Sequence, residues 1–449
     1  MTECAQPLTL GFHPSLPVHV SFSAPDTSSD GGALLLRQVD DLLGLSKWFA
    51  AFLPDERDPL RIRHSREEQV RQRLYQIALG YADCNDAGRL RQDPVFKVAC
   101  DRLPGDEEGL SSQPTLSRLE NAVDMKSLKK LMLRFEENYV ASFVSPPEVV
   151  VLDIDTTDDP THGNQQLSFF HGFYDQYMYH PMLVFDGVSG QLVTAVLRPG
   201  NAHAARGAMG VLRRIIVALK RRFPEVSIVV RADGGFMVPR LVEMLESLNA
   251  QWGGVDYLFG LPKNSVLLRM GKGATAAAEE LFAAGHKDVR HFESFRYAAE
   301  TWPHERLVVM KAERTEQGAN PRFIVTSIEG FPPELMYDAY CQRGQCENFI
   351  KDFKNALQGD RLSCSSFVAN FFRLLEHAGA YVLMHALRKQ VAAHAPSLGT
   401  AQMDTIRLRL LKVAAHVTQS VRRVLVRLPQ SFPLAPLFFA LCQAFASPP

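Results

Sequence analysis

The stretch Glu148-Val-Val-Val-Leu-Asp-Ile-Asp155-Thr-Thr-Asp-Asp-Pro160 decides the fold of this chain. A run of aliphatic, mostly β-branched residues that ends in acids and a proline predicts a buried central strand. Side chains alternate between the two faces of a strand, so Asp153 and Asp155 are expected on one face and Leu152 and Ile154 on the other. Two carboxylates on a buried strand are costly to leave unpaired, so they mark a candidate functional site.

Beyond this strand the sequence predicts a hairpin, a basic amphipathic helix and a second buried strand. Asp158 and Asp159 are interpreted as ordinary turn residues. The second strand ends in Asp233-Gly-Gly235, and glycine lets the backbone turn sharply there, so Asp233 is expected at the mouth of the sheet. The elements are expected at residues 181–185 and 192–197 (hairpin), 204–222 (helix), 226–233 (strand), 238–248 (helix) and 257–261 (strand).

This order of elements is that of a ribonuclease-H-like α/β domain, in which the first and fourth strands bring two aspartates side by side. A later helix would supply the third carboxylate. Residues 263–333 contain a Gly/Ala-rich stretch and three β-like runs, and they predict a β-rich insertion into this domain. We therefore expect a mainly helical DNA-binding region at residues 1–145, a ribonuclease-H-like catalytic domain at residues 146–390 that the insertion interrupts, and a basic helical region at residues 391–449.

The later helix is predicted at Tyr340-Cys-Gln-Arg-Gly-Gln-Cys-Glu-Asn-Phe-Ile-Lys-Asp-Phe-Lys354. In one continuous helix, five polar residues fall within an arc of about 80°: Tyr340, Arg343, Glu347, Lys351 and Lys354. Phe349 and Phe353 lie on the other side and are expected to pack on a core. A solvated helix face would also gather charges on one side. A carboxylate flanked by cations, however, also suits a site that holds a metal and phosphates.

The N-terminal region carries a second candidate element. The segment Ser111–Asn121 opens with a polar cap and a proline, as helices often do, and exposes Gln, Thr, Ser, Arg and Asn. It resembles the reading helix of a helix-turn-helix, although a capped surface helix is the commoner structure. Residues 1–32, rich in Pro, Ser, Gly and Asp, are expected to form an extended arm.

The charge of the chain is balanced overall but not locally. The 449 residues carry 49 Lys and Arg and 49 Asp and Glu. From Arg361 onward, ten Lys or Arg face two acids, and residues 197–224 carry seven Lys or Arg and no acid. An acidic pocket beside basic surfaces suits a metal-dependent enzyme that acts on a polyanion. Seven scattered cysteines, no basic segment before Arg37 and no long apolar run indicate a reducing, cytoplasmic setting without a membrane.

Taken together, these motifs resemble the DDE transposases of bacterial insertion sequences, and most closely the branch named after insertion sequence thirteen-eighty. The resemblance covers about residues 75–388. It rests on the Tyr-Arg-Glu-Lys signature helix at Tyr340, Arg343, Glu347 and Lys354, on Asp153–Gly163, on Phe170-His-Gly-Phe-Tyr-Asp175, on Arg231-Ala-Asp-Gly-Gly-Phe236, and on the Ser-Gln-Pro segment at residues 112–118.

The resemblance implies a metal-dependent enzyme that cuts and joins DNA, with Asp155, Asp233 and Glu347 as the catalytic and metal-binding triad. Asp155 is preferred to Asp153 because the family's acid directly precedes a threonine, here Thr156. Two Mg²⁺ ions, for which Mn²⁺ is expected to substitute, would suit three carboxylates that leave positions open for phosphate.

Three further residues gain a role from the resemblance: Tyr340, Arg343 and Lys354 would hold the DNA phosphates. Lys351 joins them by helical spacing alone. The expected partners are double-stranded DNA, as terminal inverted repeats and target, and a second copy of the chain on that DNA in the bacterial nucleoid. Two alternatives stay open, a transposase-derived DNA-binding protein that no longer cuts and a ribonuclease-H-like nuclease without strand transfer.

Overall fold

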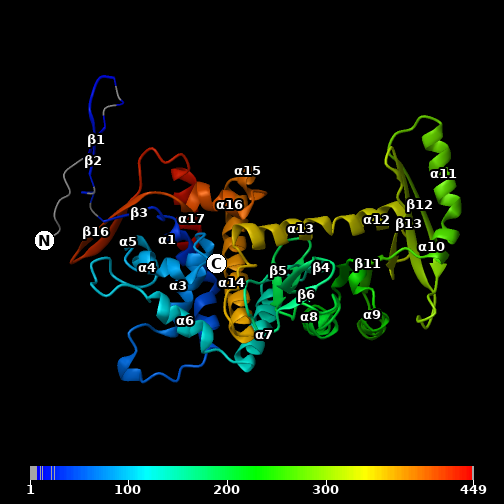
Figure 1. The fold of residues 1–449 in the computed structure, drawn as a ribbon, viewed down its shortest axis with the longest axis horizontal. Coiled ribbons are helices and arrows are strands. Elements are labelled where there is room, and N and C mark those ends of the chain that lie inside the picture. The colour runs from blue at the N-terminus through cyan, green and yellow to red at the C-terminus, as the bar shows by residue number, and fades with distance from the viewer. Residues whose placement is uncertain (1–7, 11, 13, 22, 25, 447–449) are drawn as a thin grey trace. The chain divides into compact units, whose positions relative to one another are not determined.

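The computed structural model divides the chain into two compact units, and it describes residues 8–446 apart from 11, 13, 22 and 25 (Figure 1). Unit 1 combines residues 1–120 with 383–449, and unit 2 comprises residues 121–382. The boundary between them falls within a long helix, α14 (Phe367–His394). The predicted domain ranges 1–145, 146–390 and 391–449 stay a prediction, as does the arm, of which residues 1–7 lie outside the described residues.

Unit 1 is mainly helical and joins segments from both ends of the chain. The short strand β3 (Thr27–Ser28) pairs with β16 (Ala415–Ser420), which also pairs with β17 (Arg423–Arg427). Besides part of α14, its other strands and α-helices are β1 (Leu8–Leu10), β2 (Val18–Val20), α1 (Ala33–Leu43), α2 (Leu45–Ala51), α3 (Arg66–Ala78), α4 (Ala87–Leu90), α5 (Pro94–Ala99), α6 (Gln113–Asn121), α15 (Pro396–Gly399), α16 (Met403–Ile406) and α17 (Ala435–Ala446). The helix predicted at 111–121 is therefore present as α6.

Unit 2 is built on a mixed sheet with strand order β12-β13-β15-β11-β10-β4-β8-β9, to which β14 is added beside β13. The strand β4 (Val149–Thr156) runs parallel to β10 (Ser227–Ala232), which runs parallel to β11 (Val255–Leu261). On the other side of β4, β8 (Met182–Asp186) and β9 (Leu192–Val196) form the predicted antiparallel hairpin. The predicted mixed α/β architecture is confirmed.

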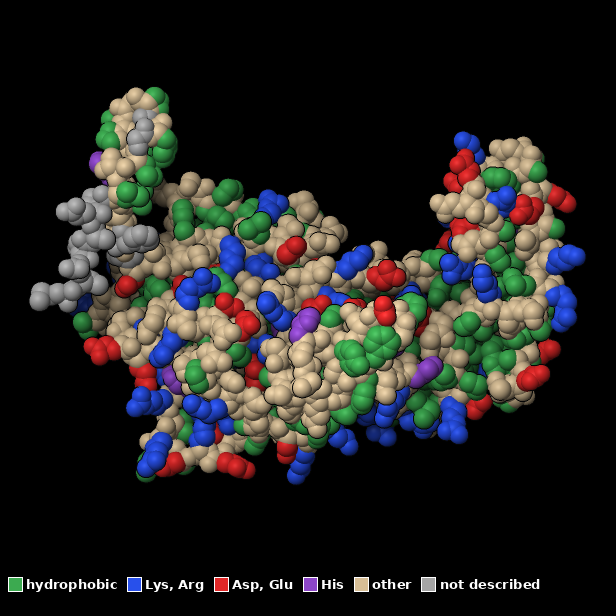
Figure 2. All heavy atoms as spheres, viewed as in Figure 1, with side chains coloured by type: hydrophobic (Ala, Val, Ile, Leu, Met, Phe, Trp, Pro, Cys, Tyr) green, Lys and Arg blue, Asp and Glu red, His purple; other side chains and the backbone are tan. Residues whose placement is uncertain are grey.

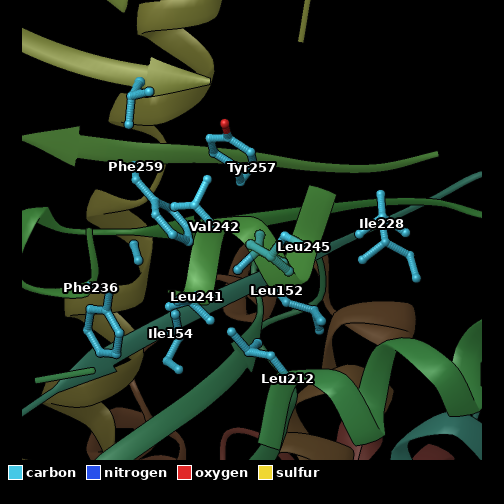
Figure 3. Close-up of a cluster of buried hydrophobic side chains, with 14 of the residues drawn as sticks. Leu152, Ile154, Leu212, Ile228, Phe236, Leu241, Val242, Leu245, Tyr257 and Phe259 are labelled. Atoms are coloured by element: carbon cyan, nitrogen blue, oxygen red, sulfur yellow. The ribbon is translucent and has the colours of Figure 1, made fainter. Parts of the chain in front are cut away.

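One face of this sheet packs on helices and forms the main core. Leu152 and Ile154 of β4 point into it, as the alternation of the strand predicts, together with Ile228 of β10 (Figure 3). The helices α8 (Ala208–Arg222) and α9 (Pro239–Trp252) supply Leu212, Leu241 and Leu245, and α7 (Met125–Ala141) adds Tyr139. Because this face takes the even-numbered residues of β4, Asp153 and Asp155 point to the opposite face.

The opposite face carries the predicted signature helix, which is not continuous. It consists of α12 (Pro333–Cys341), α13 (Gly344–Lys351) and a π-helical turn (Asp352–Ala356). Between α12 and α13 the hydrogen bonds tighten to three-residue spacing, from Arg343 to Tyr340 and from Cys346 to Arg343. The predicted helix is therefore present as two α-helical segments and a π-helical turn, with a tightened turn between the first two. The expected packing of Phe353 is confirmed, since its side chain is buried.

The segment 263–333 is β-rich as predicted, but it begins with two helices and its strands continue the central sheet. After α10 (Ser265–Met270) and α11 (Lys272–Ala283) come β12 (Val289–Tyr297), β13 (Arg306–Thr315), β14 (Gly318–Ala319) and β15 (Arg322–Thr326). The strand β15 pairs antiparallel with β11, so the segment is joined to the sheet by backbone hydrogen bonds. No helix among the described residues is long and apolar enough to cross a membrane.

Candidate active site

The candidate site lies where the parallel strands β4 and β10 end. Arg231 of β10 is in register with Asp153 of β4. Two residues further on stand Asp155, still in β4, and Asp233, which directly follows β10. Their carboxylates are close enough for the charge of Asp233 to raise the pKa of Asp155. Both predicted aspartates thus reach one edge of the sheet because parallel strands carry equivalent positions to the same end.

Asp155 is largely buried and has two hydrogen-bond donors. Its Oδ1 accepts a bond of 2.8 Å from the backbone N–H of Thr156, and its Oδ2 accepts one of 2.6 Å from Nη1 of Arg343. Burial is the main cause that raises the pKa of Asp155 to about 6, with Asp233 adding to it and Arg343 opposing it. A carboxylate whose negative charge is opposed by burial and by a second carboxylate is a place where a cation would be stabilised.

Asp233 is held by the turn that follows its strand. Its Oδ1 accepts a hydrogen bond of 2.9 Å from the backbone N–H of Gly235 and so caps the short helical turn Gly234–Phe236. The hydroxyl oxygen of Tyr340 lies against Gly260, and a Cβ at that glycine would be only 2.7 Å from it. Burial raises the pKa of Tyr340, and the charge of Asp233 adds to the rise.

Asp153 has a different environment from Asp155 and Asp233. It is fully buried and forms a bidentate pair with Arg231, with N–O distances of 2.7 and 2.8 Å. The same Arg231 donates to the carbonyl of Ala339 at the end of α12, 2.8 Å away. A Cβ at Gly187 would overlap this ion pair, so the hairpin closes tightly over it. The Asp153 carboxylate is therefore already paired within the sheet.

The remaining predicted residues are placed differently. Lys354 donates from Nζ to Oδ1 of Asp158 at 2.8 Å. Glu347 and Lys351 are exposed on α13. No group of three or more His, Cys, Asp or Glu that could hold a metal ion occurs in the part of the chain that the structure describes.

The two carboxylates that are brought together fit the chemistry of a hard divalent cation in their donor type, since Mg²⁺ takes oxygen ligands from one or two carboxylates. In this arrangement Arg343 provides the positive charge beside Asp155. Asp155 and Asp233 could therefore hold a metal.

Sequence reasoning missed or misjudged three acids near the site. Asp158 is not an ordinary turn residue, because it accepts hydrogen bonds from Lys354 and from Gln176, the latter at 3.2 Å. Asp159 lies in the strand β5 (Asp159–Pro160), is fully buried, and burial raises its pKa well above the ordinary range. The role of Asp153 could have been found, because Arg231 precedes Asp233 by the same two residues by which Asp153 precedes Asp155.

Comparison with known proteins assigns the chain to a family. A family model described as "Transposase DDE domain group 1" matches residues 12–447. The chain therefore belongs to this family of transposases. Among the curated proteins compared, none matches the chain.

Solved structures give weak similarities. The cryo-EM structure of the piggyBac transposase synaptic complex with hairpin DNA is 10% identical, with a TM-score of 0.40, over 84% of this chain and 80% of that one. The crystal structure of a pre-cleavage Mos1 transpososome is 14% identical, with a TM-score of 0.17, over 44% of this chain and 68% of that one. Both superpositions are too distant to transfer residues.

Proposed function

We propose that this chain is a DDE transposase of the insertion sequence thirteen-eighty branch that cleaves DNA at transposon ends and joins it to target DNA. The observation that carries the proposal is the meeting of Asp155, Asp233, Tyr340 and Arg343 at one end of β4 and β10. The strand order around β4 supports a ribonuclease-H-like catalytic domain. The antiparallel hairpin β8–β9 lies on one side of β4, and β10 and β11, which run parallel to β4, lie on the other.

Asp155, Asp233 and Glu347 are proposed as the metal ligands. Two Mg²⁺ ions, when bound, would activate a water or a 3′-hydroxyl and stabilise the leaving oxygen. In the structure Arg343 neutralises Asp155, and it would be released to a DNA phosphate once a cation takes over that charge. Tyr340 is proposed to donate a hydrogen bond from its hydroxyl to a DNA phosphate at the same edge.

The other phosphate contacts are proposed for Lys354 and Lys351, of which Lys354 is already ordered by Asp158. Basic surfaces such as α8, which ends in the exposed Arg221 and Arg222, would add salt-sensitive contacts to the DNA backbone. A homodimer on DNA in the bacterial nucleoid is proposed because two transposon ends must be joined in one reaction.

The test is Mg²⁺-dependent cleavage of a supercoiled plasmid that carries the element's own ends. We expect the wild type to cut at the ends, and Asp155→Asn, Asp233→Asn and Glu347→Gln to bind the DNA with near-normal affinity while cutting at least 100-fold more slowly, the scale of losing one charge-stabilising group. Asp153→Asn is the matched control on the same strand.

Each contrary result has a distinct meaning. If Asp155→Asn cuts and a folded Asp153→Asn does not, the first acid is Asp153. If Glu347→Gln cuts at the wild-type rate, the third ligand is another residue. End-specific binding without cutting by the wild type would identify a DNA-binding protein that has lost its activity, and cutting without joined products would identify a nuclease.

A further inference from the structure

A small antiparallel sheet beside the site carries an unusual set of exposed rings. It consists of β5, β6 (Phe169–His171) and β7 (Gln176–Tyr179), and β6 and β7 form a hairpin. Phe170 of β6 is directly opposite Tyr177 of β7, and their ring centroids are 5.7 Å apart. Phe173 stands in the turn. All three residues are well exposed: Phe170 to 50%, Tyr177 to 62% and Phe173 to 85%.

The hairpin is held in place and is not a loose loop. The backbone N–H groups of Tyr174 and Asp175 both donate to the carbonyl of His171, at 3.1 and 2.9 Å. Asp175 adopts a left-handed conformation with φ of 52°, which aspartate tolerates better than most residues. At the base of the hairpin, Gly200 lies so close that a Cβ there would overlap backbone oxygens of Phe169 and Met178. Phe173 is therefore presented from a fixed turn.

The inner side of the hairpin faces the carboxylates. The pKa of the Tyr174 phenol is raised mainly by burial and then by the charges of Asp158, Asp155 and Asp233. Gln176 donates to Asp158, which also accepts from Lys354. The hairpin thus has a polar side joined to the site and an aromatic side open to solvent. Figure 2 shows hydrophobic side chains at the surface near the position that β6 has in Figure 1.

We propose that this aromatic hairpin, residues 169–179, binds unpaired DNA bases next to the strand whose phosphate enters the site. The proposal rests on the proposed function, because it places DNA at Asp155 and Asp233. Aromatic rings stack on any nucleobase, which gives sequence-tolerant affinity for single strands. A backbone phosphate held at the carboxylates brings the neighbouring bases to the hairpin, and a base there can stack on Phe173 only after it has left the duplex.

The test measures binding without divalent metal, so it does not depend on cleavage. The probe is a single-stranded oligonucleotide with one 2-aminopurine, compared with the same sequence as duplex. We expect wild type to quench the 2-aminopurine. Phe173→Ala and Phe173→Leu should bind the single strand about tenfold more weakly without quenching, and Phe173→Trp should retain both properties. All variants should bind duplex DNA within about twofold of wild type.

Phe331→Ala is the matched control, since Phe331 is 60% exposed elsewhere in unit 2, and it should behave as wild type. The proposal is overturned if Phe173→Leu matches wild type, because apolar packing would then suffice without stacking. It is also overturned if Phe173→Ala leaves single-strand affinity unchanged but dissociates a dimer in sedimentation, which would make the rings a contact between copies of the chain. Quenching by a wild type that never cleaves plasmid would support stacking while rejecting the transposase proposal.

Discussion

Two acid–arginine pairs stand two residues apart on the same face of β4, and they differ in what else surrounds them. Asp153 and Arg231 are both buried, paired through two hydrogen bonds and closed over by Gly187. Asp155 and Arg343 share one hydrogen bond, and their side chains are 12 and 16% exposed beside a second carboxylate. The first pair has no room for a ligand. In the second pair, a metal ion could replace Arg343 beside Asp155, and a DNA phosphate could replace Asp155 beside Arg343. An ion pair alone therefore does not identify a site.

The largest effect expected from this difference is on stability. Arg231→Met should lower the free energy of unfolding by about 3–5 kcal/mol, because it leaves the Asp153 carboxylate buried without its partner. Arg343→Met should lower it by a smaller amount, about 1–3 kcal/mol, since it removes one hydrogen bond while Asp155 keeps the backbone N–H of Thr156 as a donor. Urea-induced unfolding measures both. Adding Asp153→Asn to Arg231→Met should recover part of the loss, and equal losses for the two arginines would contradict the comparison.

A somewhat smaller effect is expected in the pH dependence of stability. The folded pKa of Asp155, about 6, lies above the unfolded value of about 3.9, so the folded state binds more protons and loses stability as pH rises between these values. Asp155→Asn removes this titration. Its advantage in unfolding free energy over wild type should therefore grow by about 2 kcal/mol from pH 4 to pH 7.

Urea unfolding at pH 4, 5.5 and 7 measures this difference. The substitution Asp41→Asn, at an exposed acid of unit 1 that pairs with Arg37, is the control and should show a much smaller change. An advantage of Asp155→Asn that stays constant with pH would mean that Asp155 is not held at a raised pKa.

The smallest effect concerns the packing over the buried pair. Gly187→Ala should cost about 1–3 kcal/mol, because a Cβ would overlap both Asp153 and Arg231. Gly172→Ala, at a position with open space around the Cβ, should stay within about 0.5 kcal/mol of wild type. Thermal or urea unfolding of the two variants tests this, and a neutral Gly187→Ala would show that the pair can move aside.

The sequence predicted the parts of the site that depend on local periodicity. The alternation along β4 and the strand end at Asp233 follow from patterns of apolar residues, and both are confirmed. The tightened turn between α12 and α13 was not predictable from local sequence. The chain there is bound by two residues far away in the sequence, Arg231 at the carbonyl of Ala339 and Asp155 at the side chain of Arg343. The pairing of β15 with β11 was missed for a related reason, since a strand's pattern does not identify its neighbour.

The continuity of the central sheet has a consequence for deletion experiments. Met336 and Tyr337 of α12 pack on Val309 and Ile324, which belong to the segment 263–333. Removing that segment would strip α12 of its support and leave the edge of β11 unpaired, a surface that invites aggregation. If a shortened chain then failed to cut DNA, the cause would be that Tyr340 and Arg343 are no longer held in place, and not a direct role of the deleted segment in cutting. The segment is better probed by single surface substitutions than by truncation.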